Sequence, residues 1–196
     1  MGSVSGQSGD VRVWSAGLRG WWLPALLLVA GLGGPFPPAV AQDGCLKQVF
    51  NRYCLGGDVA PLMQQQPAVT KNDGERAALI FYHGPDRDYV MAFRGRIYKI
   101  LRQYRTTTQL RFDELYGLLR EKYGPGEDRS RFPSYANNAG RKQSAIRRGE
   151  GLAEHAWEPG AGWHIELSWT RELGLSLAYV ADELDRHQRE ALEGGY

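Results

Sequence analysis

The stretch from Asp88 to Gly124 constrains the fold most, because its hydrophobic period changes partway along. Apolar residues alternate from 88 to 93, and a reversal then leads into a second Tyr/Ile/Leu-rich segment, 96–104. A period of two predicts two strands joined by a tight turn. Beyond them, apolar residues recur at three- and four-residue steps: Phe112, Leu115, Leu119 and Tyr123. That spacing predicts an amphipathic helix that lies on the sheet and ends in a left-handed cap at Gly124.

Four further segments have the composition of strands: 77–82, 151–157, 162–170 and 174–180. The third alternates most regularly, with Trp163, Ile165, Leu167 and Trp169 on one side and His164, Glu166 and Ser168 on the other. Such alternation indicates a sheet with one buried face. Because sequential strands usually pair, we predict antiparallel β-meanders with helices packed on one face. The fold class is therefore α+β, and the order of its elements is consistent with a tandem helix-plus-three-strand repeat.

The first 41 residues have the pattern of a secretory signal peptide. Arg12 and Arg19 precede an apolar run, 21–34, that is too short to span a bilayer. Small residues at 39–41 then predict cleavage after Ala41. An uncleaved membrane anchor is the alternative. We therefore expect a periplasmic or secreted protein with a single domain, 42–196, and no transmembrane anchor after processing.

Both cysteines, Cys45 and Cys54, lie just beyond this cleavage point, and an exported protein meets an oxidising compartment. We therefore predict a disulfide between them. Residues 46–53 have apolar residues at helical spacing, yet positions nine apart in one helix lie about 13.5 Å apart along its axis, too far for a bridge. Either the helix stops short of one cysteine or the two cysteines stay unpaired.

The remaining segments carry weaker signals. Asp58 and Asp182 are each placed to cap a short helix, the second with a narrow apolar stripe. Residues 64–74 are polar and are predicted to be a loop. Residues 125–150 are rich in Gly, Ser, Asn and Arg and predict a long basic loop. A connection of that length is mobile or functional, and a solvated loop is the simpler interpretation.

Charge and motifs exclude several functions. The chain carries 24 Lys and Arg against 22 Asp and Glu, a near balance that gives no sign of a nucleic acid partner. The sequence has no Gly-x-Ser-x-Gly elbow, phosphate loop or nucleotide fingerprint. A cysteine nucleophile is disfavoured while the two thiols can oxidise to each other. We therefore expect no cofactor and favour a protein without catalytic activity.

The best candidate for acid–base or metal chemistry is the group His155, His164 and Glu166. Positions 164 and 166 share a strand face, and a turn brings position 155 onto the neighbouring strand. Imidazoles and a carboxylate that converge in this way bind zinc, which makes a metal-assisted hydrolase the alternative function. The other interpretation is a solvated sheet face on which these side chains meet water.

A recognition surface is predicted on the strand 96–104. Its candidate residues share one parity: Arg96, Tyr98, Arg102 and Tyr104. Arg donates hydrogen bonds in a planar fork and Tyr adds rigid contact area, a combination typical of recognition surfaces. Alternatively, the arginines only lay their stems along the sheet and reach water. Because Ile100 has the same parity, neither face of this strand is purely apolar unless the strand contains a bulge.

The layout of a helix after Leu55-Gly56-Gly57-Asp58, followed by an antiparallel meander, resembles the helix-plus-meander modules of BamE-type outer-membrane assembly lipoproteins and of β-lactamase inhibitory proteins. The resemblance covers the layout of most of the mature chain, includes no specific motif and carries over no functional residue. It implies a protein-binding or envelope role. We therefore expect a non-catalytic binding or envelope-assembly module whose partner is an acidic envelope protein, a glycan or a lipid headgroup.

Overall fold

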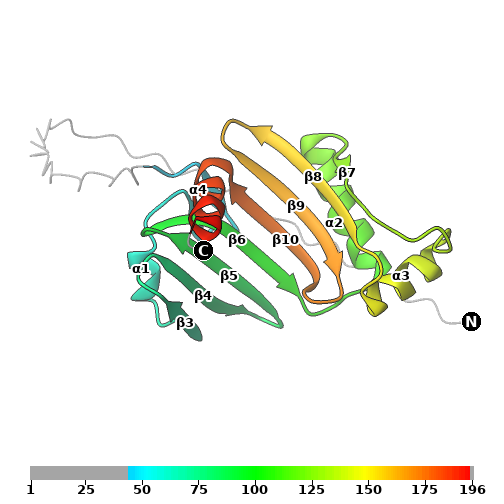
Figure 1. Cartoon of the computed structure of the whole chain (residues 1–196), viewed down its shortest axis with the longest axis horizontal. Helices are drawn as coiled ribbons and strands as arrows, with labels where there is room; N and C mark the ends of the chain where they lie inside the picture. The colour runs from blue at the N-terminus through cyan, green and yellow to red at the C-terminus, as the bar shows by residue number, and fades with distance from the viewer. Residues whose placement is uncertain (1–43, 195–196) are drawn as a thin grey trace, which may run out of the picture. The chain divides into compact units, whose positions relative to one another are not determined.

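Eight antiparallel strands form the main sheet in a computed structural model, which describes residues 44–194 (Figure 1). The strands are β3 (Val69–Asn72), β4 (Arg76–His83), β5 (Asp86–Phe93), β6 (Arg96–Tyr104), β7 (Glu127–Asp128), β8 (Ala153–Gly160), β9 (Trp163–Thr170) and β10 (Gly174–Ala181). Their order is β3-β4-β5-β6-β10-β9-β8-β7. Two meanders, β4–β6 and β8–β10, meet where β6 pairs with β10. The predicted α+β class with antiparallel meanders is confirmed.

Each half of the sheet runs in chain order from its edge to the centre, and a helix follows each meander. The helices are α1 (Ala60–Met63), α2 (Gln109–Tyr123), α3 (Ala139–Arg148) and α4 (Asp182–Glu193). A separate two-stranded sheet is formed by β1 (Lys47–Val49) and β2 (Tyr53–Leu55). The matching order of the two halves agrees with the expected repeat.

One face of the sheet carries the core. In β9 the predicted alternation is confirmed, because its four alternate apolar side chains are buried and the residues between them are partly exposed. From α2, Phe112, Leu115 and Leu119 pack against this face. The β1–β2 hairpin adds Tyr53 and Leu55, and one continuous cluster of buried side chains joins both meanders. We call this side of the sheet the covered face.

The helix predicted after β6 is confirmed as α2. It begins at Thr108, whose Oγ1 accepts a hydrogen bond from the Arg111 N–H at 3.2 Å. It ends at Gly124, whose φ of 81° fits glycine, but whose ψ of −173° makes the chain leave the helix extended. The expected left-handed cap is therefore right in φ and wrong in ψ.

A bulge in β6 resolves the mixed parity of that strand. The register with β5 shifts between Met91, which pairs with Lys99, and Ala92, which pairs with Ile97. Tyr98 is therefore the extra residue. Since an extra residue reverses the side to which the following side chains point, apolar residues on both sides of the bulge reach the core.

The helix predicted at residues 46–53 is wrong, because this segment is the β1–β2 hairpin. Two of its three turn residues, Phe50 and Asn51, have positive φ. Val49 and Tyr53 are four residues apart, as in a helix, but the turn between them makes them cross-strand partners that are both buried. The predicted Cys45–Cys54 disulfide is confirmed, with Cα atoms 5.4 Å apart, a separation that a straight helix does not allow.

The two predicted loops also contain regular structure. Residues 64–74 include the edge strand β3, whose side chains are all exposed, so no apolar alternation marks it. Residues 125–150 contain β7 and α3, which corrects the prediction of a long basic loop. In α3 only Ala145 and Ile146 are buried, and two apolar residues are too few to indicate a helix.

The caps of the short helices are partly as predicted. Asp58 Oδ1 accepts a hydrogen bond from the Ala60 N–H at 2.9 Å, at the start of α1. Asn138 Oδ1 accepts from the Arg141 N–H at 2.9 Å and caps α3. Local side-chain acceptors therefore supply backbone hydrogen bonds at both helix starts.

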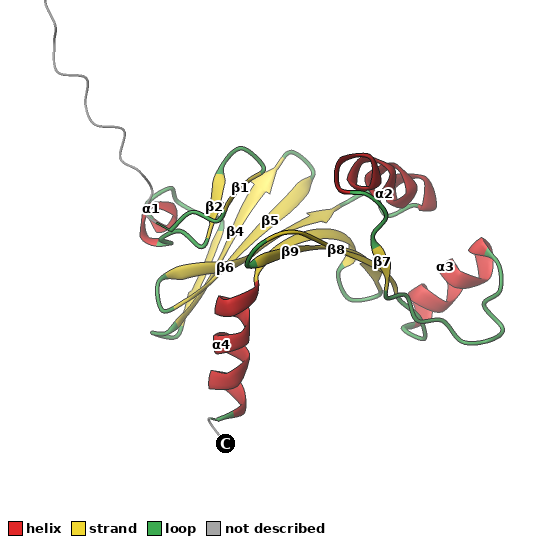
Figure 2. Ribbon diagram, turned by 90° about the horizontal axis from the view of Figure 1, so that it is seen from above, coloured by secondary structure: helices red, strands yellow, loops and turns green. Residues whose placement is uncertain are grey.

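The last helix, α4, lies on the side of the sheet opposite to α2 (Figure 2). It packs against β6 and β10. The predicted arrangement of helices on one face therefore describes α2 and not α4. Asp182 does not cap α4, since Ala181 occupies the N-cap and the Asp182 carboxylate contacts His164. Within the predicted apolar stripe Gln188 is buried, but Leu192 is exposed.

In residues 44–194, every helix falls short of the length and apolar character needed to cross a bilayer. The predicted signal peptide, residues 1–41, and its cleavage point lie outside the described residues.

Candidate functional site

Among residues 44–194, α4 is the helix that packs on the sheet opposite to α2, and it covers only part of that side (Figures 1 and 2). We call this side the open face. Strand alternation places mainly part-exposed side chains on it: Ile80, Tyr89, Met91, Lys99, Gln103, His164, Glu166 and Ser168. Antiparallel sheets often leave one face to solvent, so exposure alone does not identify a binding surface. The side chains on the open face have to be considered one by one.

Four charged side chains form a continuous hydrogen-bonded chain on the open face beside α4. Asp182 Oδ1 lies 2.5 Å from His164 Nδ1, and His164 Nε2 lies 3.2 Å from Glu166 Oε1. Lys99 Nζ donates to Glu166 Oε2 at 2.8 Å. Because Lys99 is on β6 and Glu166 on β9, this contact crosses over β10. In the register, Ala178 of β10 lies opposite Glu166 and Val180 lies opposite Lys99, and both are buried.

The members of this chain stabilise one another's charged forms. Burial raises the pKa of Glu166, but the hydrogen bond with His164 and the charge of Lys99 outweigh it and lower the pKa to about 2. The pKa of His164 is raised by the hydrogen bond with Glu166, against desolvation, and further by Asp182. The four groups are engaged with one another, which suits the attachment of α4 to the sheet better than acid–base catalysis.

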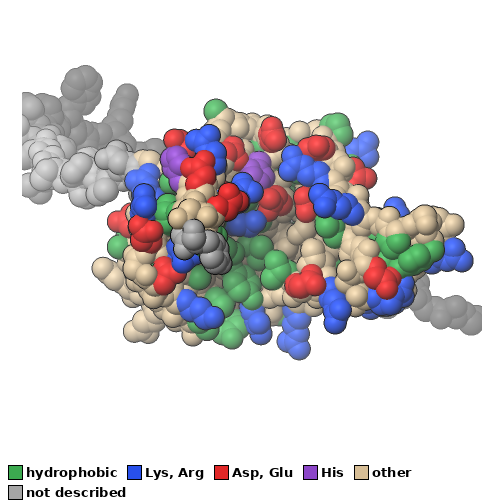
Figure 3. Space-filling model, in the orientation of Figure 1, with side chains coloured by type: hydrophobic (Ala, Val, Ile, Leu, Met, Phe, Trp, Pro, Cys, Tyr) green, Lys and Arg blue, Asp and Glu red, His purple; other side chains and the backbone are tan. Residues whose placement is uncertain are grey.

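An apolar strip crosses the open face next to the charged chain. Its centre, Leu101, Ala178 and Val180, is already buried, and the part-exposed Tyr89 and Met91 pack against it and face solvent. Figure 3 shows hydrophobic side chains gathered below α4, with charged side chains around them. Tyr98, the bulge residue, continues the strip, and its hydroxyl lies 3.7 Å from Met91 Sδ. An apolar centre with a charged margin is the usual composition of a protein–protein interface.

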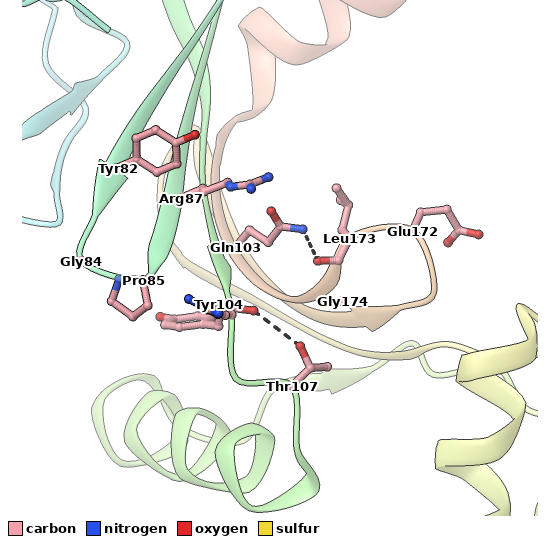
Figure 4. Close-up of a pocket in the computed structure, with 11 residues that line it drawn as sticks. Tyr82, Gly84, Pro85, Arg87, Gln103, Tyr104, Thr107, Glu172, Leu173 and Gly174 are labelled. Carbon is pink, nitrogen blue, oxygen red and sulfur yellow. Dashed lines mark hydrogen bonds between the residues drawn. The ribbon is translucent and has the colours of Figure 1, made fainter. Parts of the chain in front are cut away.

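At the end of the sheet away from α4, a depression of about 650 Å³ opens between the β4–β5 and β9–β10 turns (Figure 4). Tyr82, Arg87 and Gln103 line it from three neighbouring strands, and Leu173 lines it from the opposing turn. Gln103 is held in place, because its Nε2 donates to Leu173 O at 2.8 Å and its Oε1 accepts from the Tyr89 hydroxyl at 3.0 Å.

The depression exposes groups that suit contact with another molecule. The Tyr82 side chain is 63% exposed and Leu173 is 39% exposed. The Arg87 guanidinium lies 5.9 Å from the Tyr82 ring centroid. Within residues 44–194, Arg87 takes part in no ion pair. A Tyr and an Arg beside a concave surface are the residue types that dominate binding energy at interfaces.

The four residues predicted as a recognition surface do not form one. Arg102 and Tyr104 face the core, where Arg102 pairs with Asp88 and Tyr104 is buried. Arg96 is exposed at the start of β6, and Tyr98 lies on the open face. The prediction is wrong because the bulge breaks the common parity on which it depended.

Asp88 is the acid that holds Arg102. The Asp88 side chain is 1% exposed and accepts from Arg102 Nε at 2.6 Å and Nη2 at 2.8 Å. The Tyr53 hydroxyl donates to the same carboxylate at 3.1 Å, and the guanidinium lies 3.9 Å from the centroid of the Phe50 ring. Because Phe50 and Tyr53 belong to the disulfide-bonded hairpin, this buried ion pair attaches the hairpin to β5 and β6.

The alternative metal site of His155, His164 and Glu166 does not form, because His155 and His164 lie on opposite faces of the sheet. His155 is on the covered face, with its ring centroid 4.5 Å from that of Tyr116 on α2. His164 and Glu166 are on the open face. Metal ligands must all approach one ion to within about 2.0–2.2 Å. Across residues 44–194, no group of three or more His, Cys, Asp or Glu side chains is placed to hold a metal ion.

The sequence did not predict two features of the open face, the contact of Lys99 with Glu166 and the exposed pair Tyr82 and Arg87. Lys99 reaches Glu166, which is 67 residues further along the chain, across strand β10, so no local pattern could reveal the contact. Tyr82 and Arg87 flank the turn at 83–86 that the sequence did indicate. An aromatic residue and an arginine on either side of that turn were the available signal.

No protein-family model and no curated protein matches the chain. Among solved structures, a cysteine-rich secretory protein from Staphylococcus aureus is 10% identical with a TM-score of 0.37, over 66% of this chain and 45% of that one. An extracellular protein containing an SCP domain from Bacillus anthracis is 11% identical with a TM-score of 0.40, over 73% of this chain and 48% of that one. The chain spans less than half the length of either protein, and similarity this low assigns neither fold family nor function.

Proposed function

We propose that the protein is an exported, non-catalytic binding module of the cell envelope whose open face binds a protein partner. The observation that carries the proposal is the coexistence, on the open face, of part-exposed Tyr89, Met91 and Tyr98, a charged margin, and a depression with exposed Tyr82 and with Arg87, which forms no ion pair within residues 44–194. Tyr, Met and Arg are enriched at the cores of protein interfaces, and charged pairs are common at their rims.

A protein partner fits this face better than a lipid headgroup or a free glycan. An anionic lipid surface is attracted by clustered cations, whereas Lys99 on this face is already neutralised by Glu166. The part-exposed Tyr89, Met91 and Tyr98 offer contact to a partner that supplies apolar side chains. In the depression, the partner places a carboxylate near Arg87 and an apolar group against Tyr82 and Leu173. An acidic residue of the partner is therefore expected at Arg87.

Export is supported by the Cys45–Cys54 disulfide, since disulfides form and persist in oxidising compartments. Cell fractionation with N-terminal sequencing tests it. We expect the protein in the periplasm or the medium, starting at Gln42. A cytoplasmic protein with an intact N-terminus and both thiols free would show that export is wrong.

Site-specific photo-crosslinking tests the binding face. A photoreactive phenylalanine analogue replaces Tyr82 in the depression and, as the matched control, Leu118, which is 62% exposed on α2 on the other side of the sheet. In living cells we expect a discrete crosslinked species from position 82, absent from position 118 and lost when Arg87→Glu is added. Equal crosslinking from both positions, or none from position 82, would refute docking at the open face.

A further inference from the structure

A second concave site lies on the covered face, between α2, α3 and β8. It has a volume of about 300 Å³. Segments far apart in the sequence line it, among them Phe112, Asp113 and Tyr116 of α2, Asp128 of β7, Lys142 of α3 and His155 of β8. We call it the α2–α3 pocket. A volume of this size is at the lower end of small-molecule sites.

Aromatic rings form much of the pocket wall. The centroids of Phe112 and Trp169 are 6.3 Å apart, and those of Phe112 and His155 are 6.0 Å apart. The ring centroid of Tyr116, one turn further along α2, lies 4.5 Å from that of His155. Such rings offer an apolar, flat contact to a ligand that has both an apolar face and polar edges.

His155 carries the strongest sign of a missing ligand. Its Nδ1 atom is buried and, among residues 44–194, has no hydrogen-bond partner. A buried polar atom without a partner is rare, and an unpaired one disfavours the folded state. The neutral imidazole nitrogen donates or accepts according to its tautomer, and a hydroxyl group satisfies either case because it can do both.

The pocket rim decides between ligand classes. Asp113 and Asp128 accept hydrogen bonds, and those from Ser130 lower the pKa of Asp128 and keep it charged. Ionised carboxylates disfavour an anionic ligand. Lys142 Nζ, which lies 5.1 Å from the centroid of the Phe132 ring, already supplies a cation at this rim, so a cationic ligand would meet a like charge there. An uncharged ligand that is rich in hydroxyl groups matches both the rim and His155.

We propose that the α2–α3 pocket binds a pyranose sugar, with one sugar hydroxyl on His155 Nδ1, others on Asp113 and Asp128, and the apolar face of the ring against Tyr116 or Phe112. The site is separate from the open face, so it does not depend on partner docking there. It gives the segment 125–150 a role, since Asp128, Phe132 and Lys142 form one side of the pocket.

Saturation-transfer NMR on the mature protein tests the proposal with four probes: glucose, galactose, mannose and N-acetylglucosamine. We expect transfer to at least one sugar with millimolar affinity. The variant His155→Phe keeps the ring stacking but removes Nδ1, and should weaken binding about fivefold, as loss of one hydrogen bond predicts. Tyr116→Ala should abolish binding. The matched control His83→Phe, an exposed histidine on β4, should bind as the parent does.

The same measurements can overturn the proposal. If none of the four sugars shows transfer, or if a sugar binds the His155→Phe and parent proteins equally, the pocket is not a saccharide site. Because the assay contains no protein partner, its failure would leave the crosslinking test of the open face unaffected.

Discussion

Removal of the Asp88 carboxylate gives the sharpest test of how the structure is held together. In Asp88→Ala, Arg102 loses two charge-assisted hydrogen bonds and Tyr53 loses one. Breaking a buried ion pair by removing one partner costs about 3–5 kcal/mol, because the other charge is left buried. The Arg102 side chain is 14% exposed and can recover some hydration, which places the expected loss near the lower end, at about 3 kcal/mol.

Urea unfolding at pH 7, with the disulfide intact, measures this loss. With a slope of about 2 kcal/mol/M, the midpoint should fall by about 1.5 M. The double variant Asp88→Leu with Arg102→Leu removes both charges, so it should lie within about 1–2 kcal/mol of the parent and be more stable than Asp88→Ala. A loss below about 1 kcal/mol in Asp88→Ala would refute the reasoning, since it would mean that the pair is accessible to water and the hairpin is not attached through it.

Three further predictions concern the charged chain, the α2–α3 pocket and the disulfide. Glu166→Gln should lower the free energy of unfolding at pH 7 by on the order of 3 kcal/mol. Because the pKa of Glu166 is lower in the folded protein than in the unfolded chain, its carboxylate stabilises the fold above the unfolded-state pKa, and this contribution fades as the pH falls towards 2. A stability difference from the parent that is independent of pH would contradict the prediction. In the absence of sugar, His155→Phe should raise stability by about 1 kcal/mol in chemical unfolding, because it removes an unpaired buried nitrogen; a destabilised variant would show that Nδ1 is already satisfied. Reducing the Cys45–Cys54 bond should lower stability by about 2–3 kcal/mol in thermal or urea unfolding, and an unchanged midpoint would contradict the expected loss.

Local periodicity was sufficient to predict an element when that element buries one side along its own length. The alternation of β9 and the three- and four-residue spacing of α2 were both readable, because each element buries one side along its own length. The N-terminal hairpin was misread for the same reason. A three-residue turn between Val49 and Tyr53 produces the spacing of a helix, and only cross-strand pairing distinguishes the two.

The candidate sites depend on register and on distant partners, which a sequence pattern does not contain. A one-residue bulge moved Arg102 into the core, where Asp88 neutralises it, and the register of β8 placed His155 on the face opposite to His164. A slip of one residue moves a side chain to the other face of a sheet.

The amino-acid sequence by itself therefore determined the fold class, the two meanders and the position of the disulfide, since these follow from local alternation, turn residues and cysteine spacing. The tertiary structure alone decided which side chains meet. Contacts such as Lys99 with Glu166 join strands that are separated by dozens of residues in the sequence. The energies of these contacts depend on burial and distance, which are set only when the strands pair into the sheet.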